Sequence, residues 1–492
     1  PLPIGSVKSN IGHLEPASGV AGLMKALISL ETRRFPATLH LDDLNPLVDF
    51  AALNLAPARL AIDLDPAADQ LVCGVSSFGF GGTNAHVVLR SLSTPVPVEA
   101  PVVDYLVLSA ASREALRSTA SQHAALVAEG IAPSRLAAAL TYDRDRLKYR
   151  VVAPLEQVGD LAAALAEFAV EGRSDFLEDG SAAGKRARIC FVYSGNGAQW
   201  AGMGRTARAR NAAFRRRFDE IDAAFSRLAD RSLIADLEAE DFAERMRSGV
   251  FIQPLFFAIQ TALTAALLEA GLAPDMVLGH SLGEIAAAVT ADAISLEDAL
   301  RAILNRSICQ ESLRGQGAMA VFAASRDEIE EFVAEFGRDD VDVVAENGPK
   351  SITISGRTEG VRLVAATGRR RRMANRLLDV VYPYHTRFVE PLRADMLTAL
   401  SEIRPRPTRI ALVSTVTGGA IDGTALGAEH WWQNMRAPVL FRRAVENAAR
   451  LGADLFVEVG PRPILLSPVT DTLAELGVDG RVMASLTEAD DQ

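Results

Sequence analysis

The run Gly279-His280-Ser281-Leu282-Gly283 constrains the fold of this chain more than any other segment. The apolar residues Met276-Val-Leu278 before it predict a buried strand, and the run from Leu282 to Thr290 predicts a helix. A serine between glycines at such a turn is typical of a nucleophile elbow, where larger side chains would clash with nearby backbone. The turn would place Ser281 Oγ beside the first N–H groups of a helix, where an oxyanion is stabilised. The sequence therefore predicts an α/β domain with Ser281 as candidate nucleophile, the alternative being an ordinary turn with a chance serine.

A serine nucleophile needs a general base, and the chain offers seven histidines: His13, His40, His86, His123, His280, His385 and His430. His280 lies in the elbow and would point away from the serine in most such turns. His385, in Tyr382-Pro-Tyr-His-Thr386, follows a predicted strand whose end could deliver the side chain to a cleft. Spacing alone leaves open whether His385 meets Ser281 or is an ordinary surface or core residue.

The N-terminal part of the chain predicts a mixed α/β segment and a linker. The alanine-rich run 19–30 predicts a helix, and runs 71–75 and 86–89 predict buried strands. Between these strands, the glycine-rich run 76–82 predicts a loop at which the backbone approaches a neighbour closely. The proline-rich run 94–101 predicts a linker.

The middle of the chain, residues 102–184, predicts a small α/β domain. Its pattern is a strand at 105–109, two alanine-rich helices, a second strand at 150–154 and another helix. The segment carries no dense cluster of reactive groups and ends in an irregular stretch at 178–184.

A larger α/β domain is expected from residue 187, with a strand at 188–193 and a glycine turn at 194–198. Within it, residues 318–380 alternate in the order strand, helix, strand, strand, helix, strand. That order predicts a ferredoxin-like subdomain inserted in the larger sheet domain. Its elements are expected at 319–323, 326–336, 341–345, 352–355, 358–367 and 375–380.

Composition limits the function classes. With 492 residues and 49% hydrophobic residues, the chain is long and apolar enough for several folded domains. A net charge of −11 argues against nucleic acid or an anionic membrane as the main partner. No stretch is expected to cross a bilayer, and no secretory leader is expected at the start. The chain opens with Pro-Leu-Pro and no methionine, so we expect it to be a piece of a longer protein. Cys73, Cys190 and Cys309 form no CxxC pattern, so we expect no zinc or other metal site and a reducing cytoplasm.

Five motifs then make the chain recognisable: Ser194-Gly-Asn-Gly-Ala-Gln-Trp200, the elbow with Glu284, Asn347-Gly-Pro349, Tyr382-Pro-Tyr-His385 and Val457-Glu-Val-Gly-Pro461. In this order they resemble the malonyl-CoA:acyl-carrier-protein acyltransferase domains of type I polyketide synthases. Residues 1–90 resemble the C-terminal part of a ketosynthase, through Lys8-Ser-Asn-Ile-Gly-His13 and Gly79-Phe-Gly-Gly-Thr-Asn-Ala-His86. The middle segment resembles the ketosynthase–acyltransferase linker domain.

The resemblance covers nearly the whole chain and implies an α/β fold throughout. It implies a partial thiolase-like ketosynthase segment at 1–95 and a small α/β linker domain at 96–185. An acyltransferase domain would follow at 186–492, with an α/β-hydrolase-like core and the inserted ferredoxin-like subdomain.

The resemblance also implies catalytic roles. Ser281 would take the acyl group from coenzyme A, and His385 would be its general base and later activate the carrier-protein thiol. A backbone carbonyl at about Leu440 would hold the histidine in place of a carboxylate. The backbone N–H groups of Asn196 and Leu282 would form the oxyanion hole, although the family usually has glutamine at the first of these positions.

Substrate binding is implied at four positions. Arg306 matches the arginine that clamps the free carboxylate of malonyl-type substrates, because a guanidinium fork binds a carboxylate bidentately. Without the resemblance it would be an ordinary surface arginine of a helix. Gln199, Asn347 and Tyr384 complete the implied set.

Tyr384, directly before the histidine, bears on the extender unit. In the family a large aromatic residue there accompanies malonyl and a serine accompanies methylmalonyl, so the resemblance favours malonyl. One methyl group is worth about 1–3 kcal/mol of discrimination in an apolar pocket, which one side chain can supply. Pro383 departs from both common signatures, which leaves another dicarboxylic unit open.

The ketosynthase portion is expected to be a remnant. His13 would be the second catalytic histidine, Lys8 its supporting lysine, and Phe80 would line the acyl pocket. The family's cysteine nucleophile lies upstream of these motifs, and Cys73 is instead expected to be a small buried residue. No condensation is expected from this chain alone.

The implied substrates are malonyl-CoA, or another dicarboxylic acyl-CoA, and the phosphopantetheine arm of an acyl carrier protein. The implied partners are that carrier protein and the rest of the synthase, including the missing ketosynthase part. No tightly bound cofactor, nucleic acid or membrane is expected.

Two other readings stay open. A serine thioesterase or other α/β-hydrolase would share the elbow, but it would use an Asp or Glu to orient the base and would not need Arg306. A non-catalytic scaffold is the main expectation for residues 1–185 only. The charge run Arg369-Arg-Arg-Arg372 is expected to be a solvated helix-to-strand connection, or else a contact for the carrier protein or for coenzyme A phosphates.

Overall fold

The computed structural model describes residues 1–65, 67–68, 70–91, 103–156, 158–182, 186–336 and 339–491. The chain divides into two units, Pro1–Ala182 and Ala183–Gln492. The predicted linker at 94–101 lies outside the described residues.

The first 91 residues form small sheets beside one longer helix. Helix α2 confirms the helix predicted at 19–30, and the hairpin β5–β6 confirms both predicted strands. The prediction that these strands are buried is wrong: Val72, Phe78 and Val88 are exposed, and within the described part of this segment only α2 packs on the hairpin. The predicted loop is also shorter, because β5 continues to Phe78. The elements are β1 (Leu2–Ile4), α1 (Lys8–Ile11), η1 (Glu15–Ala17), α2 (Ser18–Thr32), β2 (Arg34–Phe35), β3 (Leu55–Pro57), β4 (Ile62–Asp63), β5 (Val72–Phe78) and β6 (Asn84–Arg90).

Residues 103–182 form an antiparallel sheet in the order β7-β8-β9 with helices packed on it, as predicted for a small α/β domain. Its own core includes Leu106, Leu116 and Phe168. The end of this segment differs from the prediction, because Glu178–Ser181 pairs with β8 as a third strand. The elements are β7 (Tyr105–Ala110), α3 (Arg113–Ala128), α4 (Pro133–Tyr142), β8 (Tyr149–Pro154), α5 (Leu161–Glu171) and β9 (Glu178–Ser181).

The second unit is built on a six-stranded sheet in the order β17-β16-β11-β10-β18-β19. All neighbouring strands are parallel except β17, which is antiparallel to β16. Central strand β10 is buried along its whole length, with alternate residues in two different hydrophobic clusters, so both faces of the sheet are covered. The strands are β10 (Ile189–Tyr193), β11 (Met276–Gly279), β16 (Ala411–Ser414), β17 (Gly419–Ile421), β18 (Leu455–Val459) and β19 (Arg481–Ala484).

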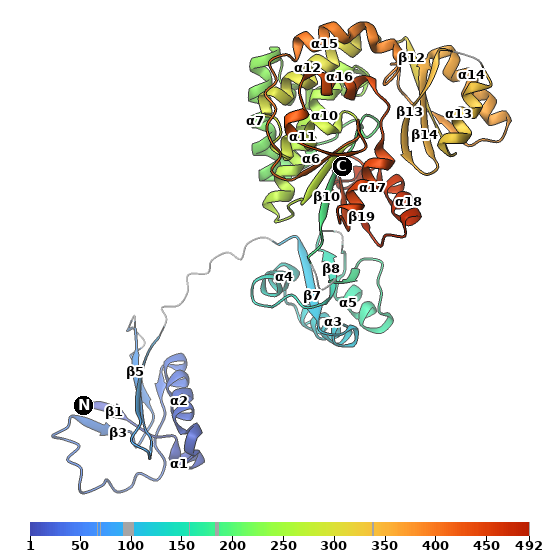
Figure 1. Cartoon of the computed structure of the whole chain (residues 1–492). Coiled ribbons are helices and arrows are strands. Elements are labelled where there is room, and N and C mark those ends of the chain that lie inside the picture. The colour runs from blue at the N-terminus through green and yellow to red at the C-terminus, as the bar shows by residue number, and fades with distance from the viewer. Residues whose placement is uncertain are drawn as a thin grey trace. The chain divides into compact units, whose positions relative to one another are not determined.

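Helices cover this sheet on both faces (Figure 1). The cluster around α7, α10, α11 and α12 is the larger core, and α17 and α18 cover the other face. The helical elements are α6 (Arg205–Arg210), α7 (Ala212–Ala229), α8 (Leu233–Leu237), α9 (Phe242–Arg245), α10 (Gly249–Glu269), α11 (Gly283–Thr290), α12 (Leu296–Glu311), η2 (Arg387–Leu392), α15 (Arg393–Ala399), η3 (Gly423–Ala425), α16 (Ala428–Arg436), α17 (Phe441–Arg450), α18 (Leu466–Leu476) and α19 (Glu488–Asp491).

Helix α10 overturns one expectation from composition. It is long and apolar enough to cross a membrane, although we expected no such segment. Most of the helix is buried inside the unit, including Phe251, Phe256 and Ile259. It is therefore a core helix, whose apolar character comes from contact with protein on nearly all sides.

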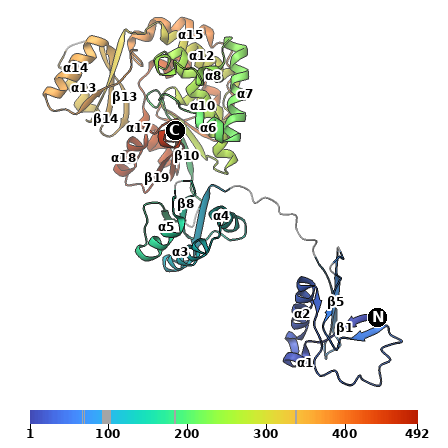
Figure 2. The same ribbon diagram turned by 180° about the vertical axis from the view of Figure 1, so that it is seen from behind.

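The ferredoxin-like subdomain is confirmed. Its sheet has the order β13-β14-β12-β15 with antiparallel neighbours, and α13 and α14 pack with it around a separate core (Figure 2). A capping box between Ser325 and Glu328 begins α13. The elements are β12 (Gly317–Phe322), α13 (Arg326–Ala334), β13 (Val341–Gly348), β14 (Ser351–Arg357), α14 (Thr358–Arg370) and β15 (Asn375–Leu377).

Candidate functional site

The predicted elbow forms between β11 and α11. Ser281 has a φ of +51°, a left-handed conformation that is rare outside glycine. A Cβ added to Gly279 would lie 2.2 Å from the Glu284 nitrogen, and one added to Gly283 would lie 2.3 Å from the Tyr193 oxygen. Only glycine fits at both places, so the two glycines allow the strained turn that carries the serine.

His385 lies against this serine. Its Nε2 is 2.8 Å from Ser281 Oγ, and its Nδ1 is 2.9 Å from the Ala437 carbonyl oxygen. Because a carbonyl can only accept, Nδ1 carries the proton, and Nε2 accepts from the serine hydroxyl. The pair is thus arranged for transfer of the Ser281 proton to His385. A backbone carbonyl holds the histidine as predicted, but it is that of Ala437, three residues before Leu440, whose N–H donates to Thr415 O.

Arg306, on α12, is the third group at Ser281. Its Nη2 donates to Ser281 Oγ at 3.0 Å, and its Nη1 donates to Gln253 at 2.9 Å and Gln310 at 3.3 Å. The side chain is only 2% exposed, so it is not the surface arginine of the alternative interpretation. Burial lowers the pKa of Arg306 to about 10, which leaves the guanidinium charged near neutral pH.

Two stacked tyrosines lie next to this group. The Tyr382 and Tyr384 rings are nearly parallel, with centroids 5.0 Å apart, and Tyr384 is 7% exposed. Burial raises the pKa of Tyr384, and the nearby charge of Arg306 acts in the opposite direction. The Tyr382 hydroxyl donates to Glu311 at 2.7 Å, and burial raises its pKa to about 12. Tyr382, anchored by Glu311, therefore supports the ring of Tyr384.

The elbow rests on a buried polar network. Glu284, in the first turn of α11, accepts from the N–H and the hydroxyl of Thr415, at 3.0 and 2.9 Å. Its other carboxyl oxygen is 2.9 Å from His430 Nε2. Asn434 Nδ2 donates to the Ser281 carbonyl at 3.0 Å. This network connects the elbow to helix α16.

Asn196 and Leu282, the expected oxyanion donors, follow the ends of two neighbouring strands, at the same edge of the sheet as Ser281. Tyr193 at the end of β10 pairs with Gly279 at the end of β11, and the chain then turns through Asn196. Leu282 is the N-cap of α11, so its N–H lies at a helix N-terminus. Gln199 Oε1 accepts from the Gly197 N–H at 2.6 Å and so braces the glycine turn.

Asn347 contacts the elbow through His280 and not through Ser281. Its Oδ1 is 2.8 Å from His280 Nε2, and its Nδ2 donates to Thr353 at 3.2 Å. As predicted, His280 is turned away from the serine, and burial lowers its pKa. This contact joins strand β13 of the ferredoxin-like subdomain to the elbow.

Burial also determines the acidity of the candidate base. It lowers the pKa of His385 to about 3, and the nearby positive charge of Arg306 contributes to the same shift. The backbone bond to Ala437 acts in the opposite direction by favouring the protonated ring. His385 is therefore a neutral acceptor across the whole range near neutral pH.

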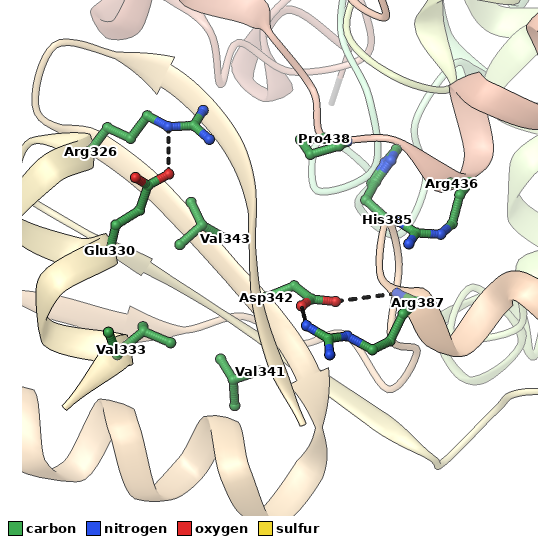
Figure 3. A pocket seen from close by; sticks show the side chains of 11 residues that line it. Arg326, Glu330, Val333, Val341, Asp342, Val343, His385, Arg387, Arg436 and Pro438 are labelled. Atoms are coloured by element: carbon green, nitrogen blue, oxygen red, sulfur yellow. Dashed lines mark hydrogen bonds and ion pairs between the residues drawn. The ribbon is translucent and has the colours of Figure 1, made fainter. Parts of the chain in front are cut away.

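A cavity of about 440 Å³ opens from His385 towards the ferredoxin-like subdomain (Figure 3). Helix α13 and strand β13 form one wall, and the opposite wall is formed by His385, Arg387, Arg436 and Pro438. Arginines Arg326 and Arg387 in this cavity are paired with Glu330 and Asp342. Of the three groups at the serine, His385 lines this cavity, and Ser281 and Arg306 are not among its lining residues.

The remaining predicted positions belong to the first unit or to the ferredoxin-like subdomain. Lys8 and His13 are exposed, and Phe80 is fully exposed, so it lines no pocket in the described residues. Cys73 is half-buried rather than buried, and desolvation raises its pKa. The run 369–372 is exposed at the end of α14, as expected for a solvated connection.

Several residues of the site were missed in the sequence. Gln253 and Gln310 orient Arg306, while Glu311 holds Tyr382. The glutamines lie in apolar helical patterns of α10 and α12, and a buried polar residue there was the available signal. No local pattern pointed to Glu311.

Comparison with known proteins then identifies the family. Residues 190–490 match the sequence model of the acyl transferase domain family. The chain belongs to the acyl transferase domain family. Residues 1–42 match the C-terminal domain of β-ketoacyl synthases, and residues 45–153 match the ketoacyl-synthetase C-terminal extension. This confirms the resemblance to a type I polyketide synthase fragment.

Relatives of this acyl transferase are large polyketide synthases. The mycoketide-CoA synthase of Mycobacterium tuberculosis is 37% identical over 96% of this chain and 12% of its own length. The chain thus spans about an eighth of that relative. The acyltransferase domain from module 8 of the salinomycin polyketide synthase is 32% identical, with a TM-score of 0.73, and 79% of this chain and 92% of that chain are covered. The acyl transferase domain of SpnD, solved in complex with 2-(pent-4-yn-1-yl)malonyl, is 26% identical over 79% of this chain and 91% of its own, with a TM-score of 0.69.

These findings favour an acyltransferase of a polyketide synthase over the two rival interpretations. The site geometry agrees, because His385 is held by a backbone carbonyl and Arg306 reaches the serine. In a hydrolase of the Ser-His-Asp type, a carboxylate holds the histidine in place of this carbonyl. The acyl transferase domain also accounts for more than half of the chain, so a scaffold role is not favoured for that part.

Proposed function

We propose that this acyltransferase moves a malonyl-type acyl group from coenzyme A to the phosphopantetheine thiol of an acyl carrier protein. One observation carries the proposal: Ser281 Oγ has a neutral histidine nitrogen at 2.8 Å and a buried guanidinium at 3.0 Å. The histidine supplies a base, and the guanidinium supplies a partner for a second carboxylate on the acyl group.

The reaction has two half-reactions with Ser281 as nucleophile and His385 as base. Ser281 Oγ attacks the thioester carbonyl while His385 Nε2 takes the hydroxyl proton, and the C–S bond then breaks as that proton passes to the thiolate of coenzyme A. In the second half, His385 takes the proton of the carrier-protein thiol. The thiolate attacks the acyl-serine ester, and Ser281 recovers the proton as it leaves.

The oxyanion formed in each half is proposed to bind the N–H groups of Leu282 and Asn196. Leu282 begins α11, whose N-terminus carries partial positive charge. Asn196 lies in the glycine turn after β10, beside the elbow strand. Each such donor contributes about 3–4 kcal/mol to transition-state stabilisation in comparable sites.

Arg306 is proposed to bind the free carboxylate of the acyl group. Gln253 and Gln310 fix its Nη1, which leaves Nη2 directed at Ser281 Oγ and thus at an acyl group on that oxygen. The buried setting makes a charge-assisted pair strong. The solved relative named in complex with a malonyl derivative supports this class of substrate.

Tyr384 is proposed to favour malonyl over methylmalonyl. Its ring is buried and stacks on the ring of Tyr382, so it cannot easily turn away from an α-methyl group. Gln199 and Asn347 are proposed to act on the substrate indirectly, through the glycine turn and His280.

The rest of the proposal concerns the longer synthase to which this chain would belong. Residues 1–95 with Lys8, His13 and Phe80 are proposed as the end of a ketosynthase, and residues 96–185 as the linker domain. Residues 186–492 are the proposed acyltransferase domain. The partners would be the carrier protein and the remaining synthase, in the cytoplasm. Among the described residues, no group of three or more His, Cys, Asp or Glu side chains could hold a metal.

Intact mass after brief exposure to malonyl-, methylmalonyl- and acetyl-CoA tests the proposal on three proteins: the parent chain, Ser281→Ala and Arg306→Ala. We expect a malonyl adduct on the parent that is absent from Ser281→Ala. We expect Arg306→Ala to shift labelling towards acetyl. Equal methylmalonyl labelling would refute the role of Tyr384, and release of free coenzyme A without an adduct would favour a hydrolase.

A further inference from the structure

Helix α16 contacts both partners of the proposed proton transfer. Within it, Asn434 Nδ2 donates to the Ser281 carbonyl at 3.0 Å. Directly after its end, the Ala437 carbonyl accepts the Nδ1 proton of His385 at 2.9 Å. One helical turn therefore connects the backbone of the nucleophile to the ring of the base.

The helix is attached to the elbow at a second point. His430, one turn before Asn434, has its Nε2 2.9 Å from Glu284 Oε1. Asn434 Nδ2 is also 3.4 Å from Glu284 Oε2. Glu284 is fully buried and lies in the first turn of α11, which begins at the elbow. Both contacts are buried, so water does not compete for them.

The elbow needs such support because its backbone is strained. A left-handed serine persists only where the surroundings determine its conformation. The Ser281 carbonyl accepts from the Glu284 N–H at 3.0 Å as well as from Asn434. Holding this carbonyl restricts rotation of the serine backbone and hence the direction of Oγ.

We propose that α16 is a positioning helix, in which Asn434 and His430 hold Ser281 Oγ and His385 Nε2 at the distance that proton transfer requires. Its C-terminus, at Ala437, carries partial negative charge and also stabilises the imidazolium that forms during transfer. Neither Asn434 nor His430 touches the reacting atoms. The inference rests on the proposed function only in taking Ser281 as nucleophile and His385 as base.

Phenylmethylsulfonyl fluoride is a suitable probe because its rate of reaction with Ser281 depends on the Ser281–His385 arrangement and does not require coenzyme A. Ser281 Oγ forms a sulfonate ester, the S–F bond breaks, fluoride leaves, and His385 takes the hydroxyl proton. We would measure the inactivation rate constant kinact and the half-saturating concentration KI by intact mass on the full chain. The variants are Asn434→Leu and His430→Phe, which keep size and lose the donor, with Gln433→Ala as a control on the same helix.

We expect Asn434→Leu to lower kinact by about 10-fold, equivalent to about 1.4 kcal/mol, with KI unchanged. His430→Phe should lower kinact by about 3-fold through Glu284, and Gln433→Ala, whose side chain bonds only to Glu429, should match the parent. The same order should appear in kcat, and not in KM, for malonyl loading. If Asn434→Leu does not fold, His430→Phe decides.

Parent-like kinact in the folded variants, or a loss confined to KI, would overturn the positioning role. A parent protein that reacts with the sulfonyl fluoride but never with malonyl-CoA would instead overturn the proposed function. The two failures are therefore distinguishable.

Discussion

His385 should stay active as a base far below the pH at which an ordinary histidine is protonated. Its pKa is about 3 because the ring is buried and faces the charge of Arg306, against an ordinary value of about 6.5. At pH 5 an ordinary histidine would be neutral in about 3% of molecules, so a rate that depends on it would fall about 30-fold relative to pH 8. With a pKa of about 3, about 99% of His385 is neutral at pH 5, and the rate should be unchanged.

The assay is the rate of Ser281 sulfonylation after rapid mixing into buffers between pH 8 and pH 5, read by intact mass. The sulfonyl fluoride carries no ionisable group, so the pH dependence reports on the protein. Arg306→Met should also keep the midpoint below 6.5, because burial is the larger cause of the shift. A parent midpoint near 6.5 would refute the reasoning.

The low pKa of His385 also makes the stability of the folded chain depend on pH. Between about pH 6.5 and pH 3 the unfolded chain binds a proton at His385 that the folded chain does not, so folded stability is lost as pH falls through this window. From pH 6.5 to pH 5 the loss amounts to about 2 kcal/mol. Denaturant unfolding of the parent and His385→Gln at both pH values should show this difference, and parallel pH slopes would contradict it.

Three further predictions concern other residues of the second unit. Tyr384→Ser should raise methylmalonyl relative to malonyl labelling by about 10-fold or more, measured by mass with both thioesters in competition, and Tyr384→Phe should keep the parent ratio; an unchanged ratio in the serine variant would remove Tyr384 from substrate selection. Burial raises the pKa of Glu458 to about 7, so between about pH 4.5 and pH 7 the folded chain holds a proton that the unfolded chain has lost, and folded stability falls as pH rises through that window. Glu458→Gln should abolish this pH dependence of the free energy of unfolding, measured with denaturant, and an unchanged dependence would assign it to another group. Gly279→Ala should prevent folding of the second unit, because its Cβ would lie 2.2 Å from the Glu284 nitrogen; a soluble variant with a parent-like melting temperature would contradict the strained elbow.

Much of the fold follows from local patterns. The alternation of strands and helices at 318–380 was sufficient to predict the ferredoxin-like subdomain, because each element carries its own apolar period. The third strand of the middle segment was missed because Glu178–Ser181 has no apolar side chain, and it pairs through its backbone with β8. Exposure of the β5–β6 hairpin was missed for a different reason, since an apolar run does not show how many layers cover it.

The candidate site divides in the same way. The identities of Ser281, His385 and Arg306 came from motifs, and the turn chemistry of the two glycines explains the elbow locally. The carbonyl that holds His385 was predicted three residues too late, because the offset depends on where α16 ends, and element ends are the least certain part of a sequence prediction. The glutamines and Glu311 were missed because each acts across helices.

The sequence by itself determined that Ser281 lies in a strand-to-helix turn between two glycines, because the apolar runs before and after the turn and the glycines in it are local features of the chain. The resemblance named His385 and Arg306, and only the tertiary structure decided that both lie against Ser281. His385 and Arg306 lie 104 and 25 positions away from Ser281. Arg306 reaches the serine from α12, and His385 is held against it by the Ala437 carbonyl directly after α16. Side-chain distances of 3 Å across such separations are set by how whole elements pack, and no local pattern encodes that packing.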